Sequence, residues 1–281
     1  MSGIVYLHPE NPGHLGDDTF WHWFKREFPE SRWDWENAGV GDVVLQYSVL
    51  GRYEGPAKYI ALCWEMYPEM QRMLPTWVGN WDSKVQKCLE CAAGTPWRTA
   101  PSAATLKYYD HLGPVKILPL AVDTDLFKRL WNRNELKEKY GIPTGVRVGF
   151  WSGTTHHMKG YDLLEQYATD HPDIYWILCW KQPSEAGHRD GSHNTVSILQ
   201  PHMNELMSCA DFFLSTGRLY PLYLVEWEAL SAGLEMVNAT GVSREIPEGS
   251  SRLAVFEHGF DRITALESWA QYIKEVLSHE G

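Results

Sequence analysis

The sequence lacks the features by which membrane-spanning and secreted proteins are recognised. No stretch approaches the roughly 18 consecutive apolar residues of a transmembrane helix. The N-terminus reads MSGIVYLHPENPG, without the basic segment and following apolar run of a secretory signal, and we expect none. Cysteines are few, five in 281 residues, and their odd number and irregular spacing give no disulfide framework. We therefore expect reduced thiols and a cytoplasmic protein without a transmembrane segment.

Residue patterns for a metal and for a dinucleotide cofactor are also missing. Cys88 and Cys91 form a CxxC pair, but zinc needs a second ligand pair at a recognisable spacing, and the sequence has none. We interpret the pair as two half-buried thiols on a helix. Neither half opens with a strand, a G-x-G-x-x-G and an acidic residue about 20 positions further on, which disfavours an NAD-dependent oxidoreductase.

Basic residues are outnumbered by acidic ones. The chain has 25 Lys and Arg against 36 Asp and Glu, a formal net charge of −11. This balance disfavours an extended phosphate-binding surface and argues against a nucleic-acid partner. The remaining composition is that of a globular protein, 44% hydrophobic and 22% charged, with 14 tryptophans. Several of these fall in expected strands and amphipathic helices, where core packing explains them: Trp21, Trp23, Trp176, Trp227 and Trp269.

The second half of the chain alternates apolar runs with helical patterns. We expect strands at 146–151, 174–180, 196–199, 211–216, 234–239 and 252–256. We expect helices from Lys159, over 201–210, over 222–233 with a stop at Gly233, and from Ile263 to Ser278. Strands alternating with helices at this spacing predict βαβ units and a parallel sheet covered on both faces.

The first half repeats this alternation more loosely. We expect strands at 4–8, 42–47, 59–64 and 115–118, and helices at 18–28 and 102–109 with Ser102 as N-cap and Gly113 as C-cap. The sequence thus predicts two α/β domains, residues 1–120 and 121–281. Open α/β sheets bind ligands beyond the carboxyl ends of their strands, so we expect the site there, in a cleft that both sheets face.

Four segments of the chain, in order, resemble motifs of the family-four retaining glycosyltransferases. The segments are PLAVDTDLF (119–127), GFWSGTTHHMKGYDLL (149–164), HMNELMSCADFFLSTG (202–217) and EALSAGLEMVNATGVSREI (228–246). They cover the second domain almost end to end. The resemblance implies the GT-B architecture, in which two Rossmann-like domains with parallel sheets face each other across a cleft. It also implies a nucleotide-sugar donor bound by the second domain and an acceptor bound by the first.

The resemblance assigns roles to particular residues, and their chemistry suits those roles. Glu228 matches the family's glutamate that accepts hydrogen bonds from the ribose hydroxyls of the donor. Lys159, at a helix start after the loop of Gly153 and Thr154, is expected to stabilise the negative charge that develops on the departing diphosphate. A lysine at a helix start opposes the helix dipole, which favours a functional role over a solvated surface lysine.

The chain departs from the family pattern in places that concern the sugar and the acceptor. Tyr220 stands where the family has a first glutamate that contacts the transferred sugar, and Glu226 lies on the opposite side of the helix from Glu228. Glu65 follows an expected strand and is a candidate for acceptor activation. Gly13 and Gly16 follow the first expected strand, and their segment resembles the family's glycine loop, which contacts the donor phosphate or the acceptor. They are further candidate site residues.

The function that the sequence predicts is transfer of a sugar from a nucleotide sugar to an acceptor hydroxyl with retention. The acceptor is not predicted: a glycan, a lipid-linked molecule and a small molecule are all compatible with the sequence. The negative net charge disfavours modified nucleic acid. The alternative, motivated by Tyr220, is a nucleotide-sugar-binding protein without catalytic activity. Asp123-Thr124-Asp125 is a literal DxD, a metal-binding motif in the other large glycosyltransferase architecture, but it falls in the interdomain segment and is expected to form a turn. We predict no cofactor and no essential metal.

Overall fold

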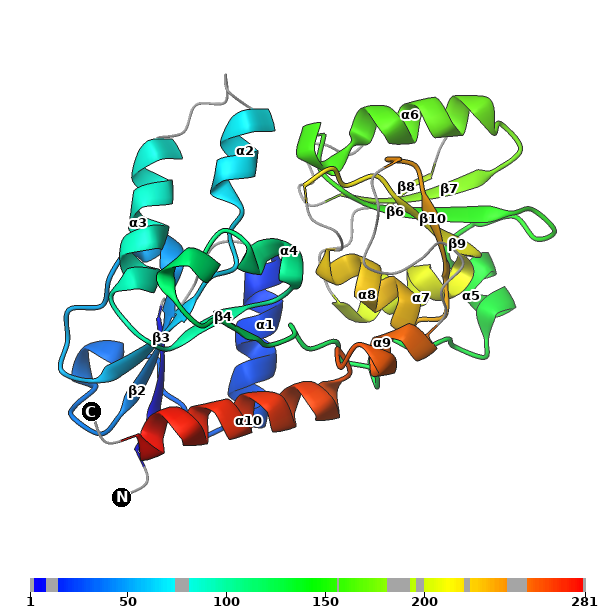
Figure 1. The fold of residues 1–281 in the computed structure, drawn as a ribbon. Helices are drawn as coiled ribbons and strands as arrows, with labels where there is room; N and C mark the ends of the chain where they lie inside the picture. Colours follow the sequence, from blue (N-terminus) through cyan, green and yellow to red (C-terminus); the bar gives the residue numbers. More distant parts are fainter. Residues whose placement is uncertain are drawn as a thin grey trace. The chain divides into compact units, whose positions relative to one another are not determined.

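The computed structural model describes residues 3–8, 15–73, 81–155, 157–180, 193–195, 200–219, 223–241 and 252–279. The chain divides into two compact units, Met1–Ala121 with Ile263–Gly281, and Val122–Arg262. Each unit contains one parallel sheet with helices packed against it (Figure 1). The predicted α/β class with two parallel sheets is therefore confirmed.

The strands of the first unit lie side by side in the order in which they occur along the chain, β1-β2-β3-β4-β5. They are β1 (Val5–His8), β2 (Val43–Tyr47), β3 (Lys58–Leu62), β4 (Arg98–Ala100) and β5 (Lys116–Ile117). The helices are α1 (Leu15–Glu27), α2 (Tyr67–Met73), α3 (Trp81–Ala93), α4 (Ala103–Leu106) and α10 (Arg262–Ser278). Ser102 is the N-cap of α4 as predicted, since its hydroxyl accepts a hydrogen bond from the Thr105 amide.

Helices cover both faces of this first sheet. Alternate residues of β1 to β3 point to one face, where they pack against α1 and α10 around the buried Trp21 and Trp269. On the other face α3 brings Cys88 against the Ser48 hydroxyl, and the Cys91 carbonyl accepts a hydrogen bond from the Tyr59 hydroxyl. Both thiols are buried, so the CxxC pair faces the core, as expected of thiols on a helix.

The closing helix belongs to the first unit, although the sequence analysis assigned residues 121–281 to the second domain. Its buried residues Ala265, Trp269, Ile273 and Val276 recur every three or four positions and join the core of the first sheet. The Trp269 indole N–H also donates to the Pro119 carbonyl, at 3.2 Å. Sequence periodicity identified the helix but carries no information about which sheet it covers.

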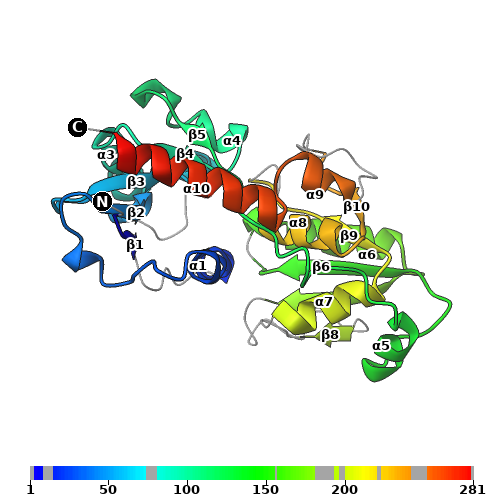
Figure 2. The same cartoon turned by 90° about the horizontal axis from the view of Figure 1, so that it is seen from below.

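The second unit has the strand order β10-β9-β6-β7-β8. Its strands are β6 (Val148–Gly153), β7 (Tyr175–Trp180), β8 (His193–Thr195), β9 (Phe212–Ser215) and β10 (Glu235–Asn238). The helices are α5 (Arg133–Lys139), α6 (Tyr161–Asp170), α7 (Gln200–Cys209), α8 (Leu224–Ser231) and α9 (Leu253–Glu257). The chain order therefore reverses between β6 and β9, as in the doubly wound dinucleotide-binding sheet (Figure 2).

The predictions for two strands and one helix end of this unit have different outcomes. The strand expected at 252–256 is wrong: the segment forms α9. Ala254 and Val255 are adjacent and both buried, while Leu253 and Phe256 on either side are exposed, a pattern that a helix can produce and an alternating strand cannot. The strand expected at 196–199 lies outside the described residues, and β8 occupies His193–Thr195. The predicted stop at Gly233 is confirmed, because this residue has φ +80° directly after α8.

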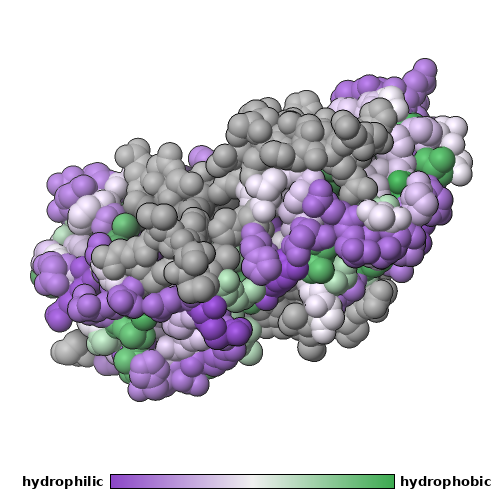
Figure 3. Space-filling model, turned by 90° about the horizontal axis from the view of Figure 1, so that it is seen from above, coloured by the Kyte–Doolittle hydropathy of each residue, from purple (hydrophilic) through white to green (hydrophobic). Residues whose placement is uncertain are grey.

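On the face drawn in Figure 3, hydrophobic residues form small separate patches among hydrophilic ones. Large exposed apolar side chains such as Val40, Trp131 and Ile263 come from separate elements. Among the described helices, none is long and apolar enough to cross a membrane.

Candidate functional site

The carboxyl ends of β6 and β9 meet where the strand order of the second sheet reverses. Open α/β sheets bind ligands at such a point because the loops leaving the two strands separate to opposite faces. Thr216, directly after β9, ties the two loops together. Its hydroxyl accepts a hydrogen bond from the Trp151 indole N–H at 2.7 Å and donates one to the Lys159 carbonyl at 2.6 Å.

The loop after β6 passes very close to the loop after β9, and glycines allow it. Gly160 has φ +67°, and a Cβ there would lie 2.0 Å from the Thr216 carbonyl oxygen. Only glycine fits both the backbone conformation and the space. Gly153 ends β6 against the Trp151 ring, from which a Cβ would be 2.8 Å away, and Thr154 follows it at the edge of the sheet.

These loops hold Lys159 at the predicted place, just before α6. It is the last residue of a short 3₁₀ turn (His157–Lys159), and its ammonium lies 3.6 Å from the centre of the Tyr223 ring. Tyr223 immediately precedes α8, so the contact joins the loops after β6 and β9. A cation over an aromatic face is attracted by the ring quadrupole. Sequence analysis did not identify Tyr223.

The hollow between these side chains is small. Its volume is about 20 Å³, which suits a water molecule and is far below the size of a nucleotide. Lys159, Thr216, Tyr223 and Glu226 are among the residues that line it. The Lys159 and Tyr223 side chains therefore occupy the space at the carboxyl ends of the strands.

Glu226 is committed to the protein itself. One carboxylate oxygen accepts a hydrogen bond from the Ser215 hydroxyl at the end of β9, and the other accepts one from the Tyr223 amide at 2.6 Å. The second contact caps the amino end of α8 in the manner of a capping box. Glu226 thus fixes the start of α8 against the sheet and is not available to replace the glutamate that the sequence lacks at 220.

Glu228 lies further along α8 and is not among the residues that line the hollow. Its side chain is buried, and no described residue donates a hydrogen bond to the carboxylate. Burial raises the pKa of Glu228 to about 8, since the charged form is deprived of water. A buried carboxylate without donors is costly, and such groups concentrate where a ligand supplies the missing partners.

Arg218 is a further cation at this edge that sequence analysis did not identify. It follows β9 and binds both oxygens of Asp162 at 2.7 and 2.6 Å. The Arg218 side chain also donates to the His157 carbonyl at 2.8 Å. Hydrogen bonds from Arg218 hold the pKa of Asp162 below its usual range. The pair fixes the turn that carries Lys159 to the start of α6.

In the first unit, Glu65 lies just beyond the carboxyl end of β3, as predicted. It accepts a hydrogen bond from the hydroxyl of Tyr47, the last residue of β2. On the neighbouring strand His8 ends β1, stacks on Trp35 with ring centres 3.8 Å apart, and its Nδ1 is 2.6 Å from the Gln46 side-chain oxygen. Burial lowers the pKa of His8, which favours the neutral imidazole. Sequence analysis missed His8 because a histidine at a strand end has no pattern of its own.

Three sequence candidates are not placed at the site. Tyr220 and Gly13 lie outside the described residues. Gly16 was expected in a loop, but the backbone there is already in the first turn of α1. The Asp123-Thr124-Asp125 segment forms a turn, because the Asp123 carboxylate accepts hydrogen bonds from the amides of Asp125 and Leu126 at 3.2 and 3.1 Å. Among the described residues no group of three or more His, Cys, Asp and Glu is arranged to hold a metal.

Comparisons with known proteins bear on the fold. No protein-family model and no curated protein sequence matches the chain. Sucrose-phosphate synthase from Thermosynechococcus elongatus has a similar structure, with a TM-score of 0.58 and 11% identity over 80% of this chain; the match spans 65% of the synthase. Anabaena Alr3699/HepE in complex with UDP-glucose gives a TM-score of 0.59 and 14% identity over 98% of this chain and 97% of that chain. WaaG, a glycosyltransferase involved in lipopolysaccharide biosynthesis, gives a TM-score of 0.57 and 15% identity over 95% of this chain and 76% of that chain.

These likenesses define the class of fold. The neighbours are GT-B glycosyltransferases, and the chain shares their two-sheet α/β architecture. The predicted GT-B fold and the predicted resemblance to GT-B glycosyltransferases are confirmed. At this level of identity the likeness concerns the fold, and the activity rests on the residues of the site.

Proposed function

We propose that this protein is a retaining glycosyltransferase that moves a sugar from a nucleotide-sugar donor to an acceptor hydroxyl. The observation that carries the proposal is Glu228, a buried carboxylate on the helix after the reversal-point strand β9, without a hydrogen-bond donor among the described residues. A ribose has two adjacent hydroxyls that can donate to one carboxylate. Binding would therefore supply the partners that the free protein does not, and would favour the ionised form of Glu228.

Lys159 supplies the positive charge in this proposal. Its ammonium rests on the Tyr223 ring at the end of β6, where a diphosphate would lie beyond the carboxyl ends of the strands. Phosphate oxygens attract the ammonium more strongly than an aromatic ring does, so donor binding draws Lys159 off Tyr223 and opens the hollow. The charge is then placed where negative charge develops as the diphosphate leaves.

The reaction needs no nucleophile from the protein. The bond between the anomeric carbon and the diphosphate oxygen breaks, and the acceptor hydroxyl attacks the same face of the sugar. The hydroxyl proton passes to the departing diphosphate, and the new glycosidic bond keeps the anomeric configuration. The residues of this chain hold the donor and stabilise the leaving group. The structure of Alr3699/HepE with UDP-glucose supports a uridine nucleotide as the first donor to try.

The acceptor is assigned to the first unit, at the carboxyl ends of β1 to β3. Glu65 with Tyr47, and the neutral His8, are the groups there that can accept a hydrogen bond from an acceptor hydroxyl. Glycans, lipid-linked saccharides and small molecules all carry such hydroxyls. The net charge of −11 continues to disfavour nucleic acid.

A panel of nucleotide sugars tests the proposal. The protein is incubated with UDP-glucose, UDP-galactose, UDP-N-acetylglucosamine, GDP-mannose and ADP-glucose, and release of the nucleoside diphosphate is followed with and without simple saccharide acceptors. We expect turnover with at least one donor and a decrease of about 100-fold in Lys159→Ala, because stabilisation of the leaving group is lost. The matched control is Lys274→Ala, which removes an exposed lysine of α10.

Equal turnover by Lys159→Ala and wild type would remove Lys159 from the reaction. The alternative, a protein that binds a nucleotide sugar without transferring it, is favoured by Tyr220 in place of a glutamate and by the engagement of Glu226 with Ser215 and Tyr223. It predicts a donor-dependent rise in melting temperature without nucleotide release under any condition.

A further inference from the structure

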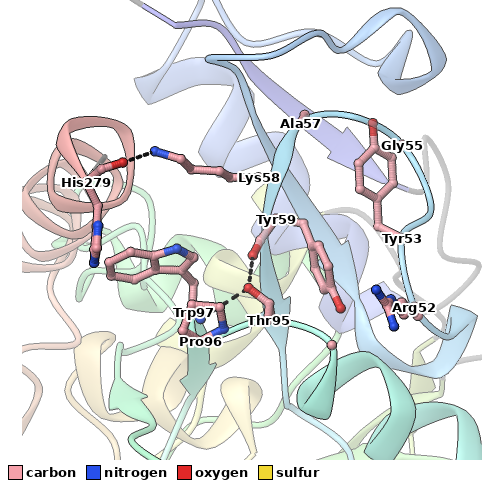
Figure 4. Close-up of a pocket in the computed structure, with 11 residues that line it drawn as sticks. Arg52, Tyr53, Gly55, Ala57, Lys58, Tyr59, Thr95, Pro96, Trp97 and His279 are labelled. Carbon is pink, nitrogen blue, oxygen red and sulfur yellow. Dashed lines mark hydrogen bonds between the residues drawn. The ribbon is translucent and has the colours of Figure 1, made fainter. Parts of the chain in front are cut away.

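A cavity in the first unit lies at the opposite edge of the first sheet from Glu65. It has a volume of about 350 Å³, within the range of small-molecule sites. The loop before β3, the loop before β4 and the end of α10 enclose it, so it lies at the amino-terminal ends of the parallel strands (Figure 4). Nothing in the proposed transfer reaction uses this edge.

Aromatic side chains form the walls of this cavity. Tyr59 and Tyr53 are buried and meet edge to face with ring centres 5.9 Å apart, while Trp97 is half-buried. In Figure 4 the Trp97 ring lies on the His279 side of Thr95, and the Tyr59 ring lies on the Arg52 side. The walls are held in place, since the Tyr59 hydroxyl donates to Cys91 and the Thr95 hydroxyl donates to the Tyr59 carbonyl at 2.7 Å.

Glycine keeps the cavity open between these walls. A Cβ on Gly94 would lie 2.2 Å from the Tyr59 hydroxyl and 3.0 Å from the Arg52 side chain. The side chain of any other residue would therefore enter the space between Tyr59 and Arg52. The close approach of the 94–97 loop to β3 depends on this position.

The two basic residues Lys58 and Arg52 that line the cavity interact with acceptors of the protein itself. The Lys58 ammonium donates to the carbonyls of Val276, at 3.0 Å, and His279, so it neutralises the negative end of α10. The Arg52 guanidinium lies 3.7 Å from the Glu54 carboxylate. Both cations that line the cavity thus already have partners, which is unfavourable for an anion and leaves a neutral, hydrogen-bonding ligand as the better match.

We infer that this cavity binds a neutral saccharide, one or two sugar units of a glycan chain, independently of the donor site. Sugar rings combine apolar C–H faces, which pack on aromatic rings, with hydroxyls that exchange hydrogen bonds with polar side chains. Trp97, Tyr53 and Tyr59 offer the first kind of contact. Arg52, Thr95 and His279 offer the second. The site would hold a glycan away from the edge where transfer is proposed.

Ligand-observed NMR on the whole protein tests this inference without any donor. Saturation transfer is recorded to maltotriose, cellotriose, xylotriose and chitotriose at millimolar concentration. We expect transfer to at least one of them and a loss of five-fold or more in Trp97→Ala. Trp131→Ala, which removes a tryptophan that is 90% exposed in the second unit, is the matched control and should retain the signal.

Trp97 also contacts Tyr272 of α10, so Arg52→Ala provides a variant that leaves the core intact; it should weaken the same signal at least two-fold. The inference is wrong if none of the trisaccharides gives transfer, or if both variants behave as wild type. It is also wrong if inorganic pyrophosphate displaces the saccharide from wild type but not from Arg52→Ala. The cavity would then be an anion site that depends on Arg52. Nucleotide-sugar binding should be unchanged in Arg52→Ala. The test of the saccharide cavity is therefore independent of the test of the proposed transfer reaction.

Discussion

Glu228 is a buried carboxylate whose protonation affects the stability of the folded chain. Burial raises its pKa from the ordinary value of 4.5 to about 8. Between these values the folded protein holds a proton that the unfolded chain releases. The stabilisation associated with this proton is present below about pH 4.5 and is lost as the pH rises through about 8.

We therefore expect Glu228→Gln to match wild type in melting temperature at pH 5 and to exceed it by a few degrees at pH 9. Glutamine cannot ionise, so the variant avoids the cost of a buried charge. Thermal unfolding followed by circular dichroism at both pH values measures this. Parallel pH profiles for the two proteins would show that the carboxylate is paired or hydrated in the folded state.

At the residue scale, sequence could identify single candidate residues but not the contacts between them. Lys159 and Glu228 stand in recognisable segments, and in the structure Lys159 ends the turn before α6 while Glu228 is buried in α8. Tyr223 and Arg218 could not be found, because their roles depend on the ring under Lys159 and on the ion pair with Asp162. Such contacts exist only once the loops after β6 and β9 have come together.

At the scale of elements, the loops after β6 and β9 are closely constrained where they meet. Gly160 has a positive φ and almost touches the Thr216 carbonyl, whereas Gly141 has a similar φ of +65° with nothing within 4 Å of its Cβ position. The two glycines separate the cost of the backbone conformation from the cost of the clash. This makes them a matched pair for mutagenesis.

We expect Gly141→Ala to lower the free energy of unfolding by about 1 kcal/mol, the cost of the left-handed conformation alone. Gly160→Ala should cost clearly more, because its methyl group also collides with the backbone of Thr216. Urea denaturation of both variants, with the second unit's tryptophans as reporters, measures the difference. Equal losses for the two variants would contradict the close approach of these loops.

Prediction of elements from sequence failed where the type of element depends on the surface against which the segment packs. Residues 252–256 are apolar enough for a strand, but burial of the adjacent Ala254 and Val255 selects a helix. The regular strands β1, β2, β6, β7 and β9 were predicted well, because their continuous apolar runs allow them to be buried on both faces of a parallel sheet.

At the scale of the whole molecule, the division into two units is not a simple cut in the sequence. The chain leaves the first unit at Ala121 and returns to it at Ile263 to add α10. The core of the first unit is therefore built from two segments that are far apart in the sequence. No sequence pattern predicts this return, since the amphipathic pattern of α10 suits either sheet.

We expect Trp269→Ala to destabilise the first unit selectively, by about 3–5 kcal/mol, because a fully buried tryptophan is removed from its core. Hydrogen exchange measured by mass spectrometry should show faster exchange in β1, β2 and β3 than in β6, β7 and β9. Trp131→Ala serves as the control and should leave both sheets unchanged. Faster exchange confined to the second sheet would contradict the assignment of α10.

The central claim is that the second unit binds a nucleotide sugar through Glu228. Isothermal titration of wild type, Glu228→Gln and Glu235→Gln with UDP, GDP, ADP and CDP at pH 8.5 tests it most directly, since Glu235 is an exposed glutamate of the same unit. We predict that at least one nucleotide binds wild type and Glu235→Gln equally. Its affinity for Glu228→Gln should be at least ten-fold lower, because a charged acceptor for the ribose hydroxyls is lost, at a cost of about 1.5–3 kcal/mol. Absence of binding by all four nucleotides, or equal affinity for all three proteins, would contradict the claim.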